Sequence, residues 1–354
     1  MLNAQGECLT PQSIPPSTKS TYVYDPNGPV KVIRVNFHFI SKTNGTGNFT
    51  ETNDGYYNPT PRSYNGYMYA DDMIKWCNEH WNINEPLLHM PIPAVPALPK
   101  KIKFQLCGVY FHKSDSDYYT YDLADSNYPP YVENTGEVIN IFITKEHRTN
   151  PSAGGVAQGL GIGESTKIFE AYSYYKTAID SNAMWYVSVP RKVINHEVGH
   201  LLNLSHVVVN CCGYSTADCD GISDTPTSGW LIDHGFNNDK PCCWDCPSKS
   251  NNLMDYSNTM GALSPMQIAR VHENIDIPRL YYRNCKFQTQ SLNITNFSAS
   301  KAYIAKKVTI PSGYNIVVNN NQALFINAEE FTINGQFEVQ LGSVFSVETN
   351  PSCD

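Results

Sequence analysis

The sequence predicts an α+β fold in two parts: a large domain of strands and helices, and a small C-terminal module that is all-β or solenoid-like. In several segments apolar residues alternate with a period of two, and in others they follow one face of a helix. Beyond about residue 290 the helical spacing is absent and short strand-like segments recur. We therefore divide the chain into an extended lead-in (1–29), a main domain (30–290) and a C-terminal module (291–354).

The first strand and the first helix of the main domain follow the lead-in, which is rich in Pro, Ser and Thr and is expected to be extended. Residues 30–40 read VKVIRVNFHFI, an alternation that predicts a strand with one apolar face. That face consists of Ile33, Val35, Phe37 and Phe39. Residues 70–81 read ADDMIKWCNEHW and predict a helix. Its apolar face consists of Met73, Ile74, Cys77 and Trp81.

Further elements are predicted downstream. Strands are expected at 101–111, 137–144 and 184–190. Pro190 then suits the start of a helix. The stretch SPMQ predicts another helix, with Ser264 at its N-cap, Pro265 at its first position and Gln267 completing a capping box. In the C-terminal module, three β-rich segments form an imperfect repeat at 308–318, 323–333 and 337–347.

Charge and cysteine content limit the function classes. The net charge of −8 without a basic run argues against a nucleic-acid partner, and no apolar run approaches a transmembrane length. Six of the eleven cysteines lie close together, which favours disulfides over a second zinc site. These six are Cys211, Cys212, Cys219, Cys242, Cys243 and Cys246. We therefore expect a secreted or cell-surface protein whose signal peptide precedes this numbering, and Cys77 could pair with Cys107.

The stretch NHEVGHLLNLSH carries the strongest functional signal. His196 and His200 are four residues apart, so on a helix they project from one face, one turn apart, and can reach one zinc ion. Glu197 is offset from them, close to the metal without binding it, as suits a general base acting on a metal-activated water. Chance would produce HExxH in such a chain about 0.01 times. The sequence therefore predicts a zinc site with its own base.

The position of the third histidine, His206, explains the asparagine at residue 203. His206 lies six residues beyond His200, too far for the same helix face, so the helix must end and the chain must turn back. Such a turn would need a positive φ at residue 203, and asparagine tolerates that conformation best after glycine. Asn203 is therefore predicted to be the helix stop that lets His206 complete a group of three zinc ligands.

Three other stretches are weaker candidates. Asp218, Asp220 and Asp224 lie in a glycine-containing turn, DCDGISD, and such clusters can hold calcium, although solvated loop carboxylates are an equal alternative. The stretch NNLMDYSN contains Met254 and Tyr256, and a methionine there is by itself ordinary core. Residues 153–161, AGGVAQGLG, could be a sheet edge that binds an extended peptide, or a flexible loop.

Together these motifs resemble the metzincin zinc peptidases, and most of all their pappalysin group. The resemblance rests on HEVGHLLNLSH, DGISDTP, NLMDYSN and the helix opening SPMQIARV, and it covers roughly 30–285. It implies a twisted mixed sheet with an active-site helix and a Met-turn. It also implies zinc on His196, His200 and His206, Glu197 as the base, Met254 beneath the site and Tyr256 steadying the tetrahedral intermediate.

The resemblance also implies a function. The chain would be a secreted zinc-dependent endopeptidase acting on protein or peptide substrates. The alternative is a zinc-bearing surface binding or adhesion protein without peptidase activity. A cell-wall amidase and a binding function of the C-terminal module, which resembles tails of secreted Bacteroidetes-type proteins, are further alternatives. Members of the group can be kept latent by a pro-segment cysteine; Cys8 could play that part or form a disulfide.

Overall fold

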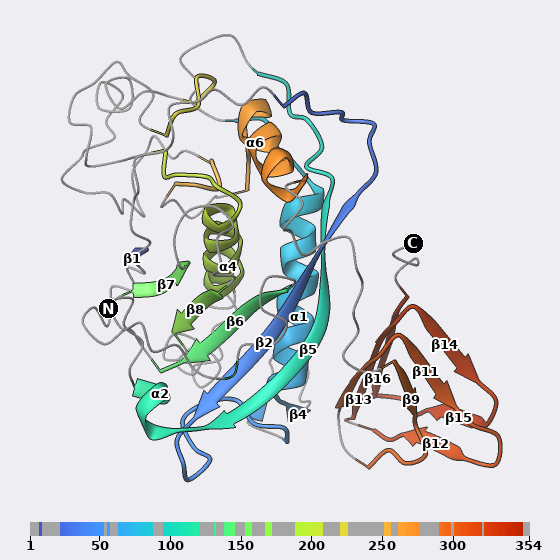
Figure 1. Cartoon of the computed structure of the whole chain (residues 1–354). Helices are drawn as coiled ribbons and strands as arrows, with labels where there is room; N and C mark the ends of the chain where they lie inside the picture. The colour runs from blue at the N-terminus through green and yellow to red at the C-terminus, as the bar shows by residue number, and fades with distance from the viewer. Residues whose placement is uncertain are drawn as a thin grey trace.

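The structure is a computed structural model of the 354-residue chain (Figure 1). It describes residues 7–8, 22–52, 55–56, 63–87, 95–119, 131, 138–145, 153–157, 167–171, 188–207, 220–225, 251–255, 261–276, 290–298, 301–320 and 322–349. No helix in these ranges is both long and apolar enough to cross a membrane.

A six-stranded mixed sheet forms the centre of the main domain, in the order β1-β7-β8-β6-β2-β5. Strands β2, β5, β6 and β8 run parallel to one another, whereas β7 is antiparallel to β8 and parallel to β1. The strand bounds are Glu7–Cys8 for β1, Lys31–Ser41 for β2, Ile102–Lys113 for β5, Ile139–Thr144 for β6, Ala153–Ala157 for β7 and Lys167–Ala171 for β8. A separate antiparallel pair is formed by β3 (Gly55–Tyr56) and β4 (Ser63–Tyr64).

Helices cover the apolar face of this sheet. The alternating residues predicted for the first strand are buried and belong to one core with helix α1 (Gly66–Asn82). Helix α1 begins four residues earlier than the predicted segment because the side chain of Asn65 accepts the Met68 N–H at 3.0 Å and caps the helix. Helix α4 (Ser188–Leu201) lies on the same side of the sheet (Figure 1). The mixed sheet and its helices confirm the α+β class predicted for the main domain.

Two sequence predictions for the main domain are wrong. The strand predicted at 184–190 is contradicted at its end, because Ser188–Pro190 already form the first turn of α4, where proline needs no intrahelical hydrogen bond. Cys77 and Cys107 are both buried but are not joined by a disulfide. Burial raises the pKa of the Cys107 thiol to about 12, so it behaves as a small apolar core residue.

The six clustered cysteines lie outside the described residues. Among the described residues, the domain also contains helices α2 (Asp115–Tyr119) and α6 (Pro265–Asp276).

The C-terminal module is a parallel β-solenoid. Its strands form three small sheets with the orders β10-β13-β16, β14-β11-β9 and β12-β15, and all pairs are parallel. Lys307 pairs with Glu330 and Ala323 with Val344, so the chain returns to the same place after 23 and 21 residues. The strands are Ser291–Asn293 (β9), Lys301–Ile304 (β10), Lys307–Ile310 (β11), Asn315–Val318 (β12), Ala323–Ala328 (β13), Glu330–Ile333 (β14), Gln336–Val339 (β15) and Val344–Thr349 (β16). The predicted repeat is therefore the coil of this solenoid.

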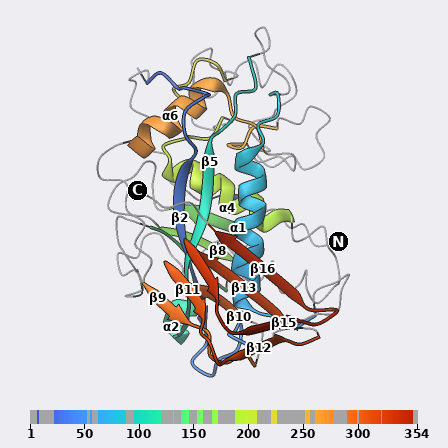
Figure 2. The same ribbon diagram turned by 90° about the vertical axis from the view of Figure 1, so that its right-hand side faces the viewer.

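One face of the solenoid packs against the main domain. Figure 2 shows the β10-β13-β16 sheet in front of α1. Ala323 and Phe325 of β13 are buried in the core cluster of the main domain, apart from the solenoid's own cluster. The Lys75 ammonium lies 4.9 Å from the centre of the Phe325 ring, and Lys103 pairs with Glu348 at 3.0 Å. The two parts of the chain thus share apolar packing as well as charge contacts.

Candidate metal centre

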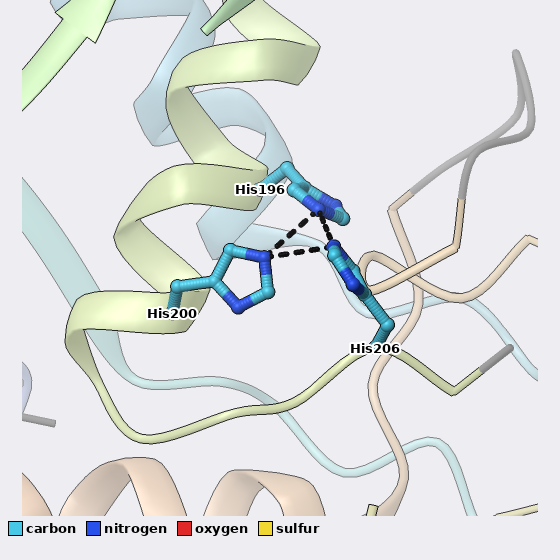
Figure 3. Close-up of side chains that lie close together, drawn as sticks. All are labelled: His196, His200 and His206. Carbon is cyan, nitrogen blue, oxygen red and sulfur yellow. Dashed lines mark hydrogen bonds between the residues drawn. The ribbon is translucent and has the colours of Figure 1, made fainter. Parts of the chain in front are cut away.

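Helix α4 presents two histidines toward one point. His196 and His200 occupy successive turns of the helix, and both side chains are buried. The rings of His196, His200 and His206 converge (Figure 3). His206 follows the helix and reaches the same point from the opposite direction.

The chain reverses at Asn203, as predicted. Asn203 has φ = 69°, in the left-handed region that asparagine adopts more readily than most residues. The Asn203 N–H donates to the His200 carbonyl, and the Leu204 N–H donates to the Gly199 carbonyl, both at 2.9 Å. These bonds satisfy the last carbonyls of the helix and close it. The predicted helix stop is therefore confirmed.

The three Nε2 atoms have the spacing of a metal-binding tripod. The distance is 3.2 Å between His196 and His200, and His206 lies 2.9 Å from each of them. Zinc bonds of about 2.0–2.1 Å in tetrahedral geometry place ligand nitrogens about 3.3 Å apart. Among the described residues, these three histidines form the one cluster of at least three His, Cys, Asp or Glu side chains that is close enough to share an ion. The donors present therefore fit a zinc ion.

Backbone carbonyls set the tautomers of the two helix histidines. The Nδ1 atom of His196 lies 2.8 Å from the Leu253 carbonyl, and that of His200 lies 2.7 Å from the Leu204 carbonyl. A carbonyl only accepts hydrogen bonds, so each Nδ1 carries the proton and each Nε2 keeps a lone pair. Such partners also orient the rings of metal-binding histidines. The lone pairs thus meet where Figure 3 shows the rings converging.

Burial keeps the three imidazoles neutral. It lowers the pKa of His196 from 6.5 to about 4, opposed by the hydrogen bond to Leu253. The pKa values of His200 and His206 are lowered well below 6.5, by burial first and then by the neighbouring histidines. Because a metal competes with protons for these nitrogens, neutral rings at pH 7 favour metal binding.

Glu197 is held beside the tripod by the central sheet. Its side chain is buried, and its Oε2 atom accepts the N–H of Ala157 at 2.7 Å. Ala157 is the last residue of β7, so this bond ties α4 to the sheet. A carboxylate that accepts a backbone N–H is held in one orientation. The arrangement can place a base next to a bound ion.

The predicted substrate edge is covered by another strand. Strand β7 lies within residues 153–161, the segment considered as a peptide-binding edge, and one of its sides pairs with β8. Its other side pairs with β1, where Glu7 opposes Ala153 and Cys8 opposes Gly155. The N-terminal segment therefore occupies the position along β7 that an added peptide strand would take.

Met254 lies in a turn that contacts both His196 and the chain beside His206. It is fully buried in the turn 251–255, whose Leu253 carbonyl accepts from His196. The Met254 carbonyl accepts the N–H of Val207, next to His206, at 3.2 Å. The contact with Val207 joins this turn to the returning chain, and the contact with His196 joins it to α4. Tyr256, predicted to assist catalysis, lies outside the described residues.

The candidate calcium residues serve the local fold where the structure describes them. Asp220 accepts the Ile222 N–H at 3.0 Å and the Thr225 hydroxyl at 2.8 Å. Asp224 accepts the Ser264 hydroxyl at 2.5 Å and the Met266 N–H at 2.9 Å, at the start of α6. Asp218 lies outside the described residues. Calcium binding therefore stays a prediction, with two of its three carboxylates already hydrogen-bonded to protein groups.

Gly199 is a site residue that sequence reasoning missed. It lies between the two helix histidines, and a Cβ atom there would collide with the Met254 sulfur. A glycine inside a helix costs roughly 0.5–1 kcal/mol relative to alanine, so its presence indicates close packing. This conformational cost was the signal in the sequence that could have identified Gly199.

The chain resembles known proteins over part of its length. A peptidase family model described as pregnancy-associated plasma protein-A matches residues 124–276, the segment that contains the three histidines and Met254. A solved structure, "Mirolysin in complex with compound 9", has 17% sequence identity and a TM-score of 0.43, covering 70% of this chain and 92% of its own. A search of curated proteins finds no match.

Proposed function

We propose, from the premise that residues 124–276 form a metallopeptidase domain of the pappalysin group, that the chain is a secreted zinc-dependent endopeptidase. The observation that carries the proposal is the tripod of Nε2 atoms, 2.9–3.2 Å apart and buried. Zinc is the metal expected for this family. His196, His200 and His206 would hold it and leave one coordination position open.

The chemistry would combine the metal with one carboxylate. When bound, zinc acts as a Lewis acid and makes water a nucleophile near neutral pH. Glu197 would accept the proton of the attacking water and donate it to the leaving amine. The Ala157 N–H supports this role because it fixes Oε2 and with it the direction of the carboxylate. Tyr256 is proposed to donate a hydrogen bond to the developing oxyanion.

The substrate would lie along β7 in an extended conformation. A peptide added to a sheet edge gains backbone hydrogen bonds independently of its side chains, which suits an endopeptidase. Strand β7 ends at Ala157, whose N–H contacts Glu197, so a peptide along β7 would pass next to the base. Because β1 pairs with the outer side of β7, the substrate would have to replace Glu7 and Cys8 there.

The test is the variant Glu197→Gln, which keeps the size and hydrogen-bonding capacity of the side chain but removes its basicity. We expect stoichiometric zinc by elemental analysis and a loss of casein cleavage of at least about 100-fold. The control is Glu79→Gln, the same change at an exposed position of α1, which should leave cleavage unchanged.

Two outcomes would contradict the proposal. Comparable casein cleavage by Glu197→Gln would exclude Glu197 as the base. A second outcome is a wild-type chain that binds zinc but cleaves no peptide, so that adding a chelator changes nothing. That result would instead indicate a zinc-bearing binding or adhesion protein.

A further inference from the structure

The peptide groups of the Met-turn determine how the metal-binding histidines are held. The Leu253 carbonyl fixes the tautomer of His196, and the Met254 carbonyl holds Val207, next to His206. A rotation of these peptide groups would therefore change the direction of both rings. The question is which residues hold the turn in place.

Asn252 holds the turn through its side chain. Its Oδ1 atom accepts the N–H of Met254 at 2.9 Å, and its backbone carbonyl accepts the N–H of Asp255 at 3.1 Å. Asn252 is buried, with 1% of its surface exposed. If its amide were rotated by 180°, the NH₂ group would face the Met254 N–H and two donors would oppose each other. The orientation of this amide therefore controls the turn.

Gln267 selects that orientation. Its Oε1 atom accepts from Asn252 Nδ2 at 2.8 Å, and its Nε2 atom donates to Asn252 Oδ1 at 3.3 Å. Gln267 is fully buried, so water does not compete for these bonds. Each of the two amides donates one hydrogen bond to the other and accepts one from it. Only one relative orientation of the amides allows both hydrogen bonds.

The start of helix α6 in turn fixes Gln267. Its Oε1 atom also accepts the Ser264 N–H at 2.9 Å, and its own N–H donates to the Ser264 hydroxyl oxygen at 3.1 Å. This is the capping box predicted from the sequence. The Ser264 hydroxyl donates to Asp224, which also accepts the Met266 N–H. The pair Asn252–Gln267 is thus attached to a rigid helix end.

We propose that Asn252 and Gln267 form a positioning pair that sets the geometry of the metal centre. The backbone N–H of Ser264 orients the Gln267 side chain, Gln267 orients Asn252, and Asn252 holds the peptide groups that contact His196 and the chain beside His206. Neither residue is one of the three histidines that would hold the metal. The inference rests on the proposed function, because it takes the three histidines as zinc ligands.

The test compares Gln267→Met with Ser264→Ala. The first removes both amide contacts to Asn252 with little change in volume. The second removes the capping hydroxyl of the same helix but keeps the backbone N–H of residue 264, which holds Gln267 Oε1, and so leaves the amide pair in place. We expect Gln267→Met to weaken zinc binding about 10- to 100-fold, the effect typical of removing partners of metal ligands. Ser264→Ala should lower thermal stability but leave zinc affinity within about twofold.

Cobalt(II) provides a readout that a loss of stability alone does not change. The visible spectrum of the Co²⁺ protein reports ligand geometry, so it should shift in Gln267→Met and stay unchanged in Ser264→Ala. Gln267→Glu keeps the acceptor for Asn252 and Ser264 but loses the donor to Asn252 Oδ1. Gln267→Glu should shift the spectrum in the same direction, and it replaces Gln267→Met as the test variant if Gln267→Met does not fold.

The outcomes separate this inference from the proposed function. A wild-type chain that binds neither Zn²⁺ nor Co²⁺ stoichiometrically would overturn both. A wild-type chain that binds them, with Gln267→Met and Gln267→Glu showing wild-type affinity and spectrum, would overturn the positioning pair alone. Equal losses of affinity in Gln267→Met and Ser264→Ala would also overturn it, because a general weakening of α6 would then explain the effect.

Discussion

The sulfur of Met254 packs against the backbone of Gly199, in the space that a side chain at residue 199 would need. A Cβ atom on Gly199 would collide with Met254 Sδ and lie 3.3 Å from its methyl carbon. Because Gly199 lies between His196 and His200, this contact sets the distance between the helix and the turn beneath it. The turn that contains Met254 is therefore in direct contact with the helix backbone.

Gly199→Ala should push the Met-turn away from α4. We expect a loss of about 1–3 kcal/mol in the free energy of unfolding, the usual effect of adding a methyl group to a packed core. Zinc affinity should fall as well. Urea unfolding and a zinc competition titration measure the two effects. The double variant Gly199→Ala with Met254→Ala has room for the methyl group and should recover part of the affinity; no recovery would exclude the collision as the cause.

Asn203→Ala and Asn203→Gly should separate backbone conformation from side-chain contacts. At φ = 69°, alanine is strained by about 1–2 kcal/mol, whereas glycine is not. We therefore expect the alanine variant to be less stable by about 1 kcal/mol and the glycine variant to match the wild type, measured by urea unfolding. If both variants lose the same stability, the asparagine side chain rather than the φ angle is responsible.

Two hydrogen-bonded histidines of the central sheet, one buried and one half-buried, should make the protein sensitive to acid. Burial lowers the pKa of His38 to about 3 and that of His112 to about 4, and the two rings share a hydrogen bond at 3.0 Å. His38 also bonds Asn140, and Asp117 partly offsets the shift of His112. Both folded-state pKa values lie below 6.5, so the unfolded chain takes up protons first as the pH falls. The stability contributed by the neutral rings is complete above pH 6.5 and is lost between pH 6.5 and 3.

The measurement is the free energy of unfolding between pH 7.5 and 4.5. Below pH 6.5, His38 alone should contribute a slope of about 1.4 kcal/mol per pH unit. Glutamine can donate to Asn140 and accept from His112, so His38→Gln should give a shallower slope. Parallel pH curves for the wild type and His38→Gln would show that His38 does not carry this effect.

Phe325 should connect the stability of the solenoid to that of the main domain. It is 4% exposed and lies in the core cluster that contains α1. Phe325→Ala should lower the free energy of unfolding by about 3–5 kcal/mol and make the main domain easier to cleave with trypsin. The control is Phe337→Ala, at a partly buried position that packs against the solenoid's own cluster. If Phe337→Ala makes the main domain easier to cleave and Phe325→Ala does not, the contact of Phe325 with the main-domain core contributes little to the stability of that domain.

Local patterns predicted the parts of the site that lie on one short segment. The spacing of His196 and His200 follows from the helical repeat, and the positive φ of Asn203 follows from the need to return to His206. The end of the strand predicted at 184–190 was misassigned for a related reason: apolar residues do not distinguish the end of a strand from the start of a helix whose proline lies in the first turn.

The three histidines, the adjacent glutamate and the repeat of the C-terminal strands could be identified from residue patterns alone, because periodicity and turn chemistry act within a few residues. The groups that support them became visible only in the folded chain. The contacts of Ala157 with Glu197, of Leu253 with His196 and of β13 with α1 join segments far apart in the chain. Such contacts depend on how the core packs as a whole, and no local pattern of residues encodes that packing.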